Sequence, residues 1–323
     1  MPAIPALDSE APPVLVEIVR SGFVEGVHRG RLVLLDSDGS VALEVGDSRA
    51  TVLPRSCNKL MQATGMVEAG LGLEGELLAI AAGSHSAQDF HIEAVRAILA
   101  DAGLPVEALQ TPPAVPSEEK ALAEFYRAGG HEAPIYYNCS GKHAAMLSVS
   151  ARNGWPIESY LDPGHPVQLA GRAAIERLTG EPVRAEAVDG CGAPLLGFSL
   201  VGLARAFRAS VLAEPGTPER RVADAMRANP RYVSGDGGVD TVAMGSVPGL
   251  LGKIGAEAVY AAALEDGRAL AFKIEDGAKR AVPVVLAEAL RRLDVPTSDV
   301  AAFGAAPLYG GGVPVGELRP VFG

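Results

Sequence analysis

Residues 49–59 read RATVLPRSCNK and contain the change from strand to helix around which the rest of the chain is arranged. The run 49–53 is typical of a strand, Pro54 interrupts it, and a helical pattern follows. Ser56 and Lys59 are three residues apart at the start of that helix, so their side chains lie on one face within hydrogen-bonding reach. A neutral lysine amine there can accept the serine proton, which predicts a nucleophile and its base. The alternative is a helix-capping serine beside a solvated lysine.

Strand patterns occur near both ends of the chain. The strand-like runs are residues 14–19, 31–35, 41–45, 256–264 and 269–274. An Asp-Gly pair between apolar runs predicts a hairpin, and it occurs at Asp38-Gly39 and at Asp266-Gly267. Between these parts the patterns are mainly helical, with short extended runs at 135–137 and 183–188. The sequence therefore predicts an α/β (α+β) fold, in which helices flank an antiparallel sheet from the N- and C-terminal parts and a helical region is inserted between them.

The same patterns predict one domain. Its sheet part is expected at about residues 13–55 and 245–323, and its helical part at about residues 56–244. Residues 1–12 are rich in proline and alanine, which predicts a disordered tail.

Charge and cysteine content exclude several classes of protein. The net charge of −11 argues against binding to nucleic acid or to an anionic membrane, because both carry dense negative charge. The apolar runs are too short or too interrupted to span a membrane. Three cysteines in 323 residues do not form a disulfide framework. Residues 1–13 lack the basic segment and apolar core of a secretory signal, so we expect a cytoplasmic protein.

Six stretches, found in the same order, resemble the class 3 or rhizobial-type L-asparaginases of the asparaginase II family. The resemblance implies a fold similar to that of serine β-lactamases and bacterial glutaminases. It also implies hydrolysis of L-asparagine to L-aspartate and ammonia through an acyl-enzyme, commonly by a homodimer. The stretches are Arg55-Ser56-Cys57-Asn58-Lys59, Ala82-Gly83-Ser84-His85-Ser86, Asn138-Cys139-Ser140-Gly141-Lys142-His143, Asp189-Gly190-Cys191, Gly252-Lys253-Ile254-Gly255-Ala256 and Lys273-Ile274-Glu275-Asp276-Gly277.

By this resemblance, two Ser–Lys pairs meet in the active site. Ser56 pairs with Lys59 and attacks the side-chain amide, whereas Ser84 pairs with Lys253 and relays protons or holds the leaving ammonia. An exposed lysine is protonated at neutral pH and is no base. Burial and a second ammonium nearby lower a lysine pKa, so two crowded amines titrate together. We favour Lys59 as the base, with Lys253 cationic or shuttling protons.

The substrate's α-carboxylate and α-ammonium both need partners. Arg55 is the candidate for the carboxylate, because a guanidinium can bind it with two hydrogen bonds, and Asp189 is the candidate for the ammonium. His143 is expected to bind substrate or a metal-bound water. Without the resemblance, Arg55 reads as a surface ion-pair residue and Asp189 as a turn residue.

The resemblance also implies a zinc site made by Cys139, Lys142 and Cys191. Two thiolates and one neutral amine leave a tetrahedral position open for water or substrate. The other interpretation is two buried structural thiols and a Lys142 that pairs with Asp189.

Two other functions compete with the asparaginase interpretation. The first is a glutaminase or a β-lactamase-like serine amidohydrolase on the same scaffold. The second is a non-catalytic, metal-stabilised protein that binds an amino acid. Two Ser–Lys pairs weigh against the second, because a binding protein does not require them.

Overall fold

The computed structural model describes residues 11–322, and the tail expected at residues 1–12 lies almost wholly outside them. Within the described residues, the large sheet has eight strands in the order β10-β11-β1-β2-β9-β8-β7, with β3 paired to β2, and all of these pairs are antiparallel. Its strands come only from the two ends of the chain, which confirms the predicted fold class. They are β1 (Val14–Arg20), β2 (Phe23–Leu35), β3 (Val41–Val45), β7 (Leu251–Gly255), β8 (Val259–Ala263), β9 (Ala269–Ile274), β10 (Pro307–Gly310) and β11 (Val313–Pro320).

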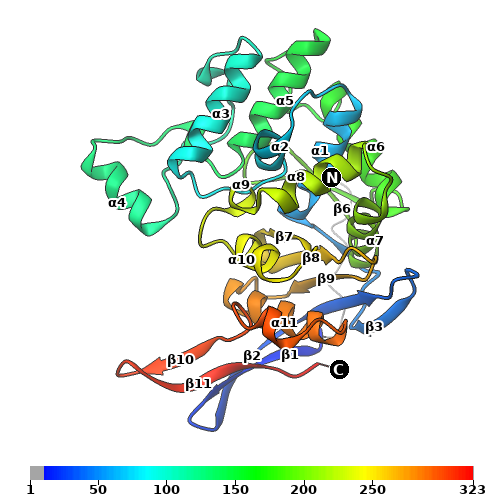
Figure 1. Cartoon of the computed structure of the whole chain (residues 1–323), viewed down its shortest axis with the longest axis vertical. Coiled ribbons are helices and arrows are strands. Elements are labelled where there is room, and N and C mark those ends of the chain that lie inside the picture. The colour runs from blue at the N-terminus through cyan, green and yellow to red at the C-terminus, as the bar shows by residue number, and fades with distance from the viewer. Residues whose placement is uncertain (1–10, 323) are drawn as a thin grey trace.

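The inserted residues form a mainly helical part, which lies above the large sheet in Figure 1. Among the described residues, no helix has the length and apolar character needed to cross a membrane. A small antiparallel sheet, in the order β4-β6-β5, also belongs to this part, and it was not anticipated as a sheet. The elements are β4 (Thr51–Val52), α1 (Lys59–Glu68), α2 (Gly75–Ala81), α3 (Asp89–Asp101), α4 (Glu119–Arg127), α5 (Ser140–Asn153), α6 (Pro166–Thr179), β5 (Ala185–Val188), β6 (Pro194–Ser199), α7 (Leu200–Leu212), α8 (Pro218–Ala228), α9 (Pro230–Ser234) and α10 (Val239–Ser246).

The two faces of the large sheet are covered by different helices. Leu32 and Leu34 of β2 belong to a buried cluster with α11 (Val282–Arg292), whereas Val33 and Leu35 belong to a cluster with α1 and α7. Successive side chains of a strand point to opposite faces, so β2 is apolar on both faces here instead of alternating. Packing against α1 and α7 therefore joins the sheet to the helical part, and α11 covers the opposite face.

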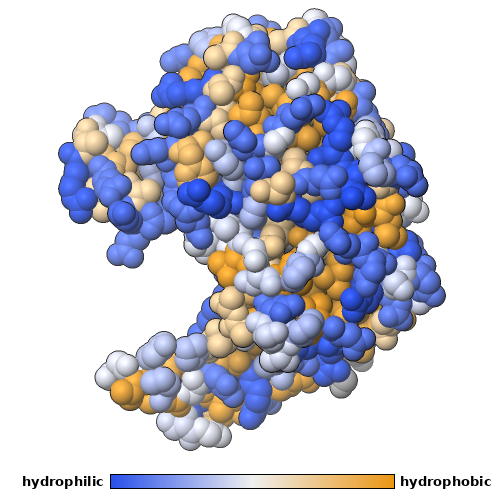
Figure 2. Space-filling model, in the orientation of Figure 1, coloured by the Kyte–Doolittle hydropathy of each residue, from blue (hydrophilic) through white to orange (hydrophobic). Residues whose placement is uncertain are grey.

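Two projecting pieces frame a hollow on one face of the molecule. Helix α4 extends from the helical part and the β10–β11 hairpin extends from the sheet part (Figure 1). Figure 2 shows the surface hollowed between these two projections. The hollow lies where the helical and sheet parts meet.

Two predicted strands differ from the structure, and local backbone geometry explains both differences. Residues 135–137, expected as a strand, overlap the 3-10 helix η3 (Pro134–Tyr136), because Pro134 at its start has a φ that suits a helical turn. The strand expected from residue 256 begins at Val259. Before it, Glu257 has a φ of 58° and Ala258 a φ of 55°, and these left-handed conformations do not fit a strand.

The strand expected over residues 49–53 is also shorter. The Asp47 carboxylate accepts hydrogen bonds from the N–H groups of Arg49 and Ala50, at 2.9 and 3.1 Å. These groups are used in a turn, so only Thr51–Val52 pairs as β4.

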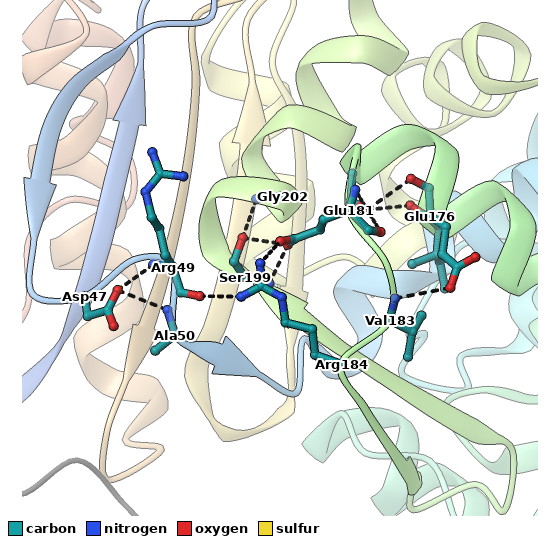
Figure 3. A network of polar contacts seen from close by, with 11 residues as sticks. Asp47, Arg49, Ala50, Glu176, Glu181, Val183, Arg184, Ser199 and Gly202 are labelled. Atoms are coloured by element: carbon teal, nitrogen blue, oxygen red, sulfur yellow. Dashed lines mark hydrogen bonds and ion pairs between the residues drawn. The ribbon is translucent and has the colours of Figure 1, made fainter. Parts of the chain in front are cut away.

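The segment before Ser56 is held in place by the polar network in Figure 3. The Arg184 guanidinium donates to the Arg49 carbonyl at 2.8 Å and also binds the Glu181 carboxylate. Glu181 in turn accepts from the N–H and hydroxyl of Ser199, at 2.7 and 2.6 Å. The network joins the entry of β4 to the end of β6, so the chain reaches Ser56 from a fixed direction.

Candidate active site

Ser56 lies in the 3-10 helix η1 (Arg55–Asn58), which connects β4 to α1 and packs against the edge strand β7. The approach is close, because a Cβ atom on Gly255 would lie 2.6 Å from the Pro54 carbonyl oxygen and 3.3 Å from the Ser56 nitrogen. Only glycine fits such a contact. Arg55 has a φ of 50°, a conformation that costs a non-glycine residue about 1–3 kcal/mol and that clusters at functional sites.

The Lys59 amine is buried and bonded to the second predicted serine. It donates to the Gly83 carbonyl and, at 3.0 Å, to the Ser84 hydroxyl. Burial is the main cause that lowers the pKa of Lys59; the charge of the Cys139 sulfur opposes it, and the ammonium groups of Lys142 and Lys253 add to it. The neutral amine, which can accept a proton, is therefore easier to form here than in an exposed lysine.

Lys253 lies in β7 and forms an ion pair with Asp240, with 3.0 Å between Nζ and Oδ2. It also donates to the Ile254 carbonyl at 2.9 Å. Within the described residues, the contacts thus differ from the predicted pairs, because Ser84 bonds to Lys59 and Lys253 bonds to Asp240. The physical reason is that a buried ammonium is stabilised more by a buried carboxylate than by a neutral hydroxyl.

Both serines line one cavity of about 420 Å³. Ser56 is half-buried, and in the part of the chain that the structure describes its hydroxyl makes no hydrogen bond to another protein group. Tyr137 and Lys279 also line this cavity. A larger cavity of about 570 Å³, between α3 and α4, includes none of the predicted site residues among its lining. The smaller cavity is therefore the candidate substrate pocket.

Arg55 and Asp189 are bonded to each other, with 2.8 Å between Nε and Oδ1. Their side chains are 22% and 12% exposed, so the pair is neither a surface ion pair nor fully buried. Burial opposes ionisation of Asp189, but the charge of Lys142, the Gly190 N–H and Arg55 outweigh it and lower the pKa of this carboxyl. The pair presents one charge of each sign beside Ser56, the set that a zwitterionic amino acid requires.

The three predicted metal ligands meet in a buried group. The Lys142 amine lies 3.4 Å from the Cys191 sulfur, and Cys139 and Cys191 pack in one cluster. A hydrogen bond from the Cys191 thiol lowers the pKa of Cys139 well below its usual value; burial opposes this, and the charges of Lys59 and Lys142 add to it. Among the described residues, no group of three or more His, Cys, Asp or Glu side chains is arranged to hold a metal ion, so a metal here would need Lys142 as its third ligand.

His143 lies beside this cluster and does not line the 420 Å³ cavity. Its Nδ1 is 2.8 Å from the Tyr160 hydroxyl, and its buried Nε2 has no hydrogen-bond partner among the described residues. Burial lowers the pKa of His143 to about 4, so the imidazole is neutral at physiological pH. A neutral imidazole thus lies near the Cys191 sulfur.

A comparison with known protein families shows which family the chain matches. The family model for L-asparaginase II matches residues 16–320. The chain belongs to the L-asparaginase II family. The match covers nearly the whole chain, so the resemblance seen in six separate stretches is confirmed. Membership makes the protein an amidohydrolase of the asparaginase kind. No curated protein matches the chain significantly.

Solved structures are similar to this chain only at low sequence identity. One is "EstCE1, a hydrolase with promiscuous acyltransferase activity", with 11% identity, a TM-score of 0.42, and coverage of 81% of this chain and 93% of that chain. Another is described as "Probable glutaminase ybaS", with 13% identity, a TM-score of 0.39, and coverage of 82% and 86%. Likeness at this level gives no information on chemistry.

Sequence reasoning missed Asp240, the partner of Lys253. A usable signal was present, because Asp240 is the single charged residue in the otherwise mainly apolar run Val239–Ser246. A carboxylate in such a run, when its helix is buried, needs a partner of opposite charge.

Proposed function

We propose that the protein hydrolyses L-asparagine to L-aspartate and ammonia, with Ser56 as the nucleophile. The observation that carries the proposal is one cavity lined by Ser56 and Ser84, with the buried Lys59 amine bonded to Ser84 at 3.0 Å. A hydroxyl open to a pocket and an amine with a lowered pKa are the two parts that serine–lysine chemistry needs.

In the proposed reaction, the Ser56 oxygen attacks the side-chain amide carbon and its proton passes to the neutral Lys59 amine. The C–N bond then breaks, and the nitrogen leaves as ammonia after it receives a proton from Lys59 through the Ser84 hydroxyl. Water hydrolyses the resulting acyl-enzyme by the reverse proton path and frees Ser56. The backbone N–H of Ser56 is the candidate donor to the tetrahedral oxyanion.

Arg55 and Asp189 are proposed to recognise the α-carboxylate and the α-ammonium of the substrate. Their mutual ion pair supports this, because a zwitterion can replace each partner with a group of the same charge. The cavity residue Tyr137 lies beside this pair, since its hydroxyl would be 3.0 Å from a Cβ atom on Gly190. His143 remains a proposed contact to substrate or to a metal-bound water.

Ammonia release tests the substrate. We expect ammonia from L-asparagine at a rate above that from L-glutamine, and no turnover of a chromogenic β-lactam. A rate with glutamine above that with asparagine would make the protein a glutaminase. Ligand-dependent stabilisation against heat with no ammonia from either amide would favour the non-catalytic binding protein.

We further propose that Cys139, Lys142 and Cys191 bind zinc. The donor set fits by position, because two buried sulfurs and an amine converge. The pKa of Cys139 is lowered, whereas the pKa values of Cys191 and Lys142 are raised, so zinc would have to displace a proton from each of these two ligands. Zinc held there would supply Lewis-acid polarisation of the substrate. The open Nε2 of His143 is a further nitrogen beside this set.

Metal content tests the zinc proposal. Purified protein is expected to contain about one zinc per chain, and Cys139→Ser should lose most of it because three ligands do not tolerate removal of one. Cys57 is the matched control, because it is buried elsewhere and its thiol donates to the Lys253 carbonyl at 3.1 Å. Cys57→Ala should keep its zinc. Zinc content near zero in the unaltered protein, after mild purification without chelator, would leave the cysteines structural.

Homodimer formation is also proposed, on the basis of the family resemblance, and the cytoplasmic location expected from the sequence stays a proposal. Exposed apolar side chains on two neighbouring hairpins of the sheet support self-association. They are Phe23 and Val24 beside the β1–β2 turn, and Tyr309 and Val313 on the β10–β11 hairpin.

A further inference from the structure

The two buried lysines of the site have different surroundings. The Lys59 amine donates to a carbonyl and a hydroxyl, both neutral, and the charged group that acts on it most strongly is the Cys139 sulfur, not a carboxylate. The Lys253 amine faces a carboxylate, and the side chains of Lys253 and Asp240 are each 0% exposed. Within residues 11–322, Lys253 has no other ion pair. The two amines therefore differ in the charge that stands opposite them.

Asp240 uses both carboxylate oxygens on β7. Its Oδ2 lies 3.0 Å from Lys253 Nζ, and its Oδ1 accepts from the Ile254 N–H at 2.8 Å. The Lys253 amine also donates to the carbonyl of the same residue, Ile254, at 2.9 Å. One carboxylate thus fixes both the strand and the lysine head group, which limits where the amine can lie.

We propose that Asp240 is a positioning residue that holds the Lys253 amine as the fixed cation of the active site, so that Lys253 serves the reaction as a cation and not as a base. The inference rests on the proposed serine–lysine amidohydrolase. It decides between the two roles left open for Lys253, a fixed cation or a proton shuttle.

The groups around Lys253 support this assignment. A buried ammonium is costly without a counter-charge, and the Asp240 carboxylate supplies that charge at 3.0 Å. Tyr260 on β8 supplies no second negative charge, since burial and the charge of Asp240 raise the pKa of its hydroxyl. Burial likewise raises the pKa of the Cys57 thiol on η1. Lys59 on α1 is a further charged neighbour. Burial is the main cause of its lowered pKa, and the charge of Lys253 adds to it.

The test compares the pH dependence of ammonia release by Asp240→Asn and by the unaltered enzyme, between about pH 6 and pH 9. The amide keeps the shape of the carboxylate but removes its charge, so the buried Lys253 ammonium loses its counter-charge. We expect kcat at the alkaline end to fall about 10-fold to 100-fold and to recover toward the unaltered value as the pH is lowered, with KM changed much less than kcat. Asp240→Glu, which restores the charge, should return the pH profile toward that of the unaltered enzyme.

Asp224→Asn is the matched control, because Asp224 is a half-exposed carboxylate that pairs with Arg220 and Arg227 away from the cavity. Its pH profile should not change. A loss in Asp240→Asn that is equal at every pH would make Asp240 merely structural. A kcat equal to or above that of the unaltered enzyme would make Lys253 the base. Either result overturns the proposal.

A second pair of variants keeps Asp240 in place and does not depend on the folding of Asp240→Asn. Arginine stays charged at every pH used, so Lys253→Arg preserves a cation but cannot act as a base. It should turn over at least about 10-fold faster than Lys253→Met if Lys253 acts as a cation. Equal inactivity of the two variants would count against the proposal.

A failure of the proposed function itself has a different signature, namely no ammonia from the unaltered protein. The ion pair can then still be judged by heat denaturation of Asp240→Asn, Lys253→Met and the double variant. Each single change leaves a buried charge without a partner, so the double variant should be more stable than either single variant. A double variant as unstable as the sum of both changes would overturn Asp240 as the holder of this cation.

Discussion

Replacement of Ser56 by alanine is expected to lower ammonia release from L-asparagine by about 10⁴-fold or more, while the protein remains folded. The reason is that Ser56 supplies the attacking oxygen, and nothing else in the proposed reaction can form the acyl-enzyme. Folding should survive because the Ser56 hydroxyl is half-buried and makes no hydrogen bond to another described group, so its removal leaves no buried partner unsatisfied. A coupled ammonia assay and a thermal unfolding curve measure the two parts of this result.

Ser84 is the rival nucleophile, because the observed hydrogen bond joins Lys59 to Ser84. Ser84→Ala is expected to slow the reaction less than Ser56→Ala, since it removes a proton relay worth about 10²–10⁴-fold and not the attacking atom. Ser298→Ala on α12 (Thr297–Val300) is the matched control, because this serine is exposed and lies outside the cavity. Near-normal turnover in Ser56→Ala, with an inactive Ser84→Ala, would transfer the role of nucleophile to Ser84.

Replacement of Lys59 by methionine is expected to lower kcat by about 10³-fold. Methionine fills a similar volume but has no amine, so Ser84 loses the amine that lies 3.0 Å from its hydroxyl and the proposed reaction loses its base. Its flexible apolar chain suits this buried position, and the protein should therefore fold. Steady-state kinetics with L-asparagine check the effect, and KM should change less than kcat because the lost interaction acts in the transition state.

Lys253→Met is expected to be severely impaired as well, because the charge of Lys253 adds to the burial that lowers the pKa of Lys59. Lys120→Met on α4 should behave like the unaltered enzyme, since Lys120 is exposed and lies outside the cavity. If Lys59→Met is inactive but Lys253→Met is near normal, the two lysines do not act together and the account based on crowded amines is wrong.

Several parts of the fold followed from local sequence patterns. The Asp-Gly pairs at Asp38-Gly39 and Asp266-Gly267 fall in the turns of the observed β2–β3 and β8–β9 hairpins. The run 269–274 matches β9, because a buried apolar run between turn residues has few other stable conformations. The run 135–137 was mistaken for a strand because apolar content alone does not separate a short strand from a 3-10 turn.

The sequence by itself determined the fold class, the family and the set of residues to consider, because periodicity and short motifs are local properties. Only the tertiary structure decided which lysine bonds to which partner, since Lys59 and Ser84 are 25 residues apart and Arg55 and Asp189 are 134 apart. It also brought Asp240 to Lys253, a contact that no local pattern encodes. The physical reason is that a buried charge takes the nearest opposite charge that packing provides, and packing depends on the whole chain.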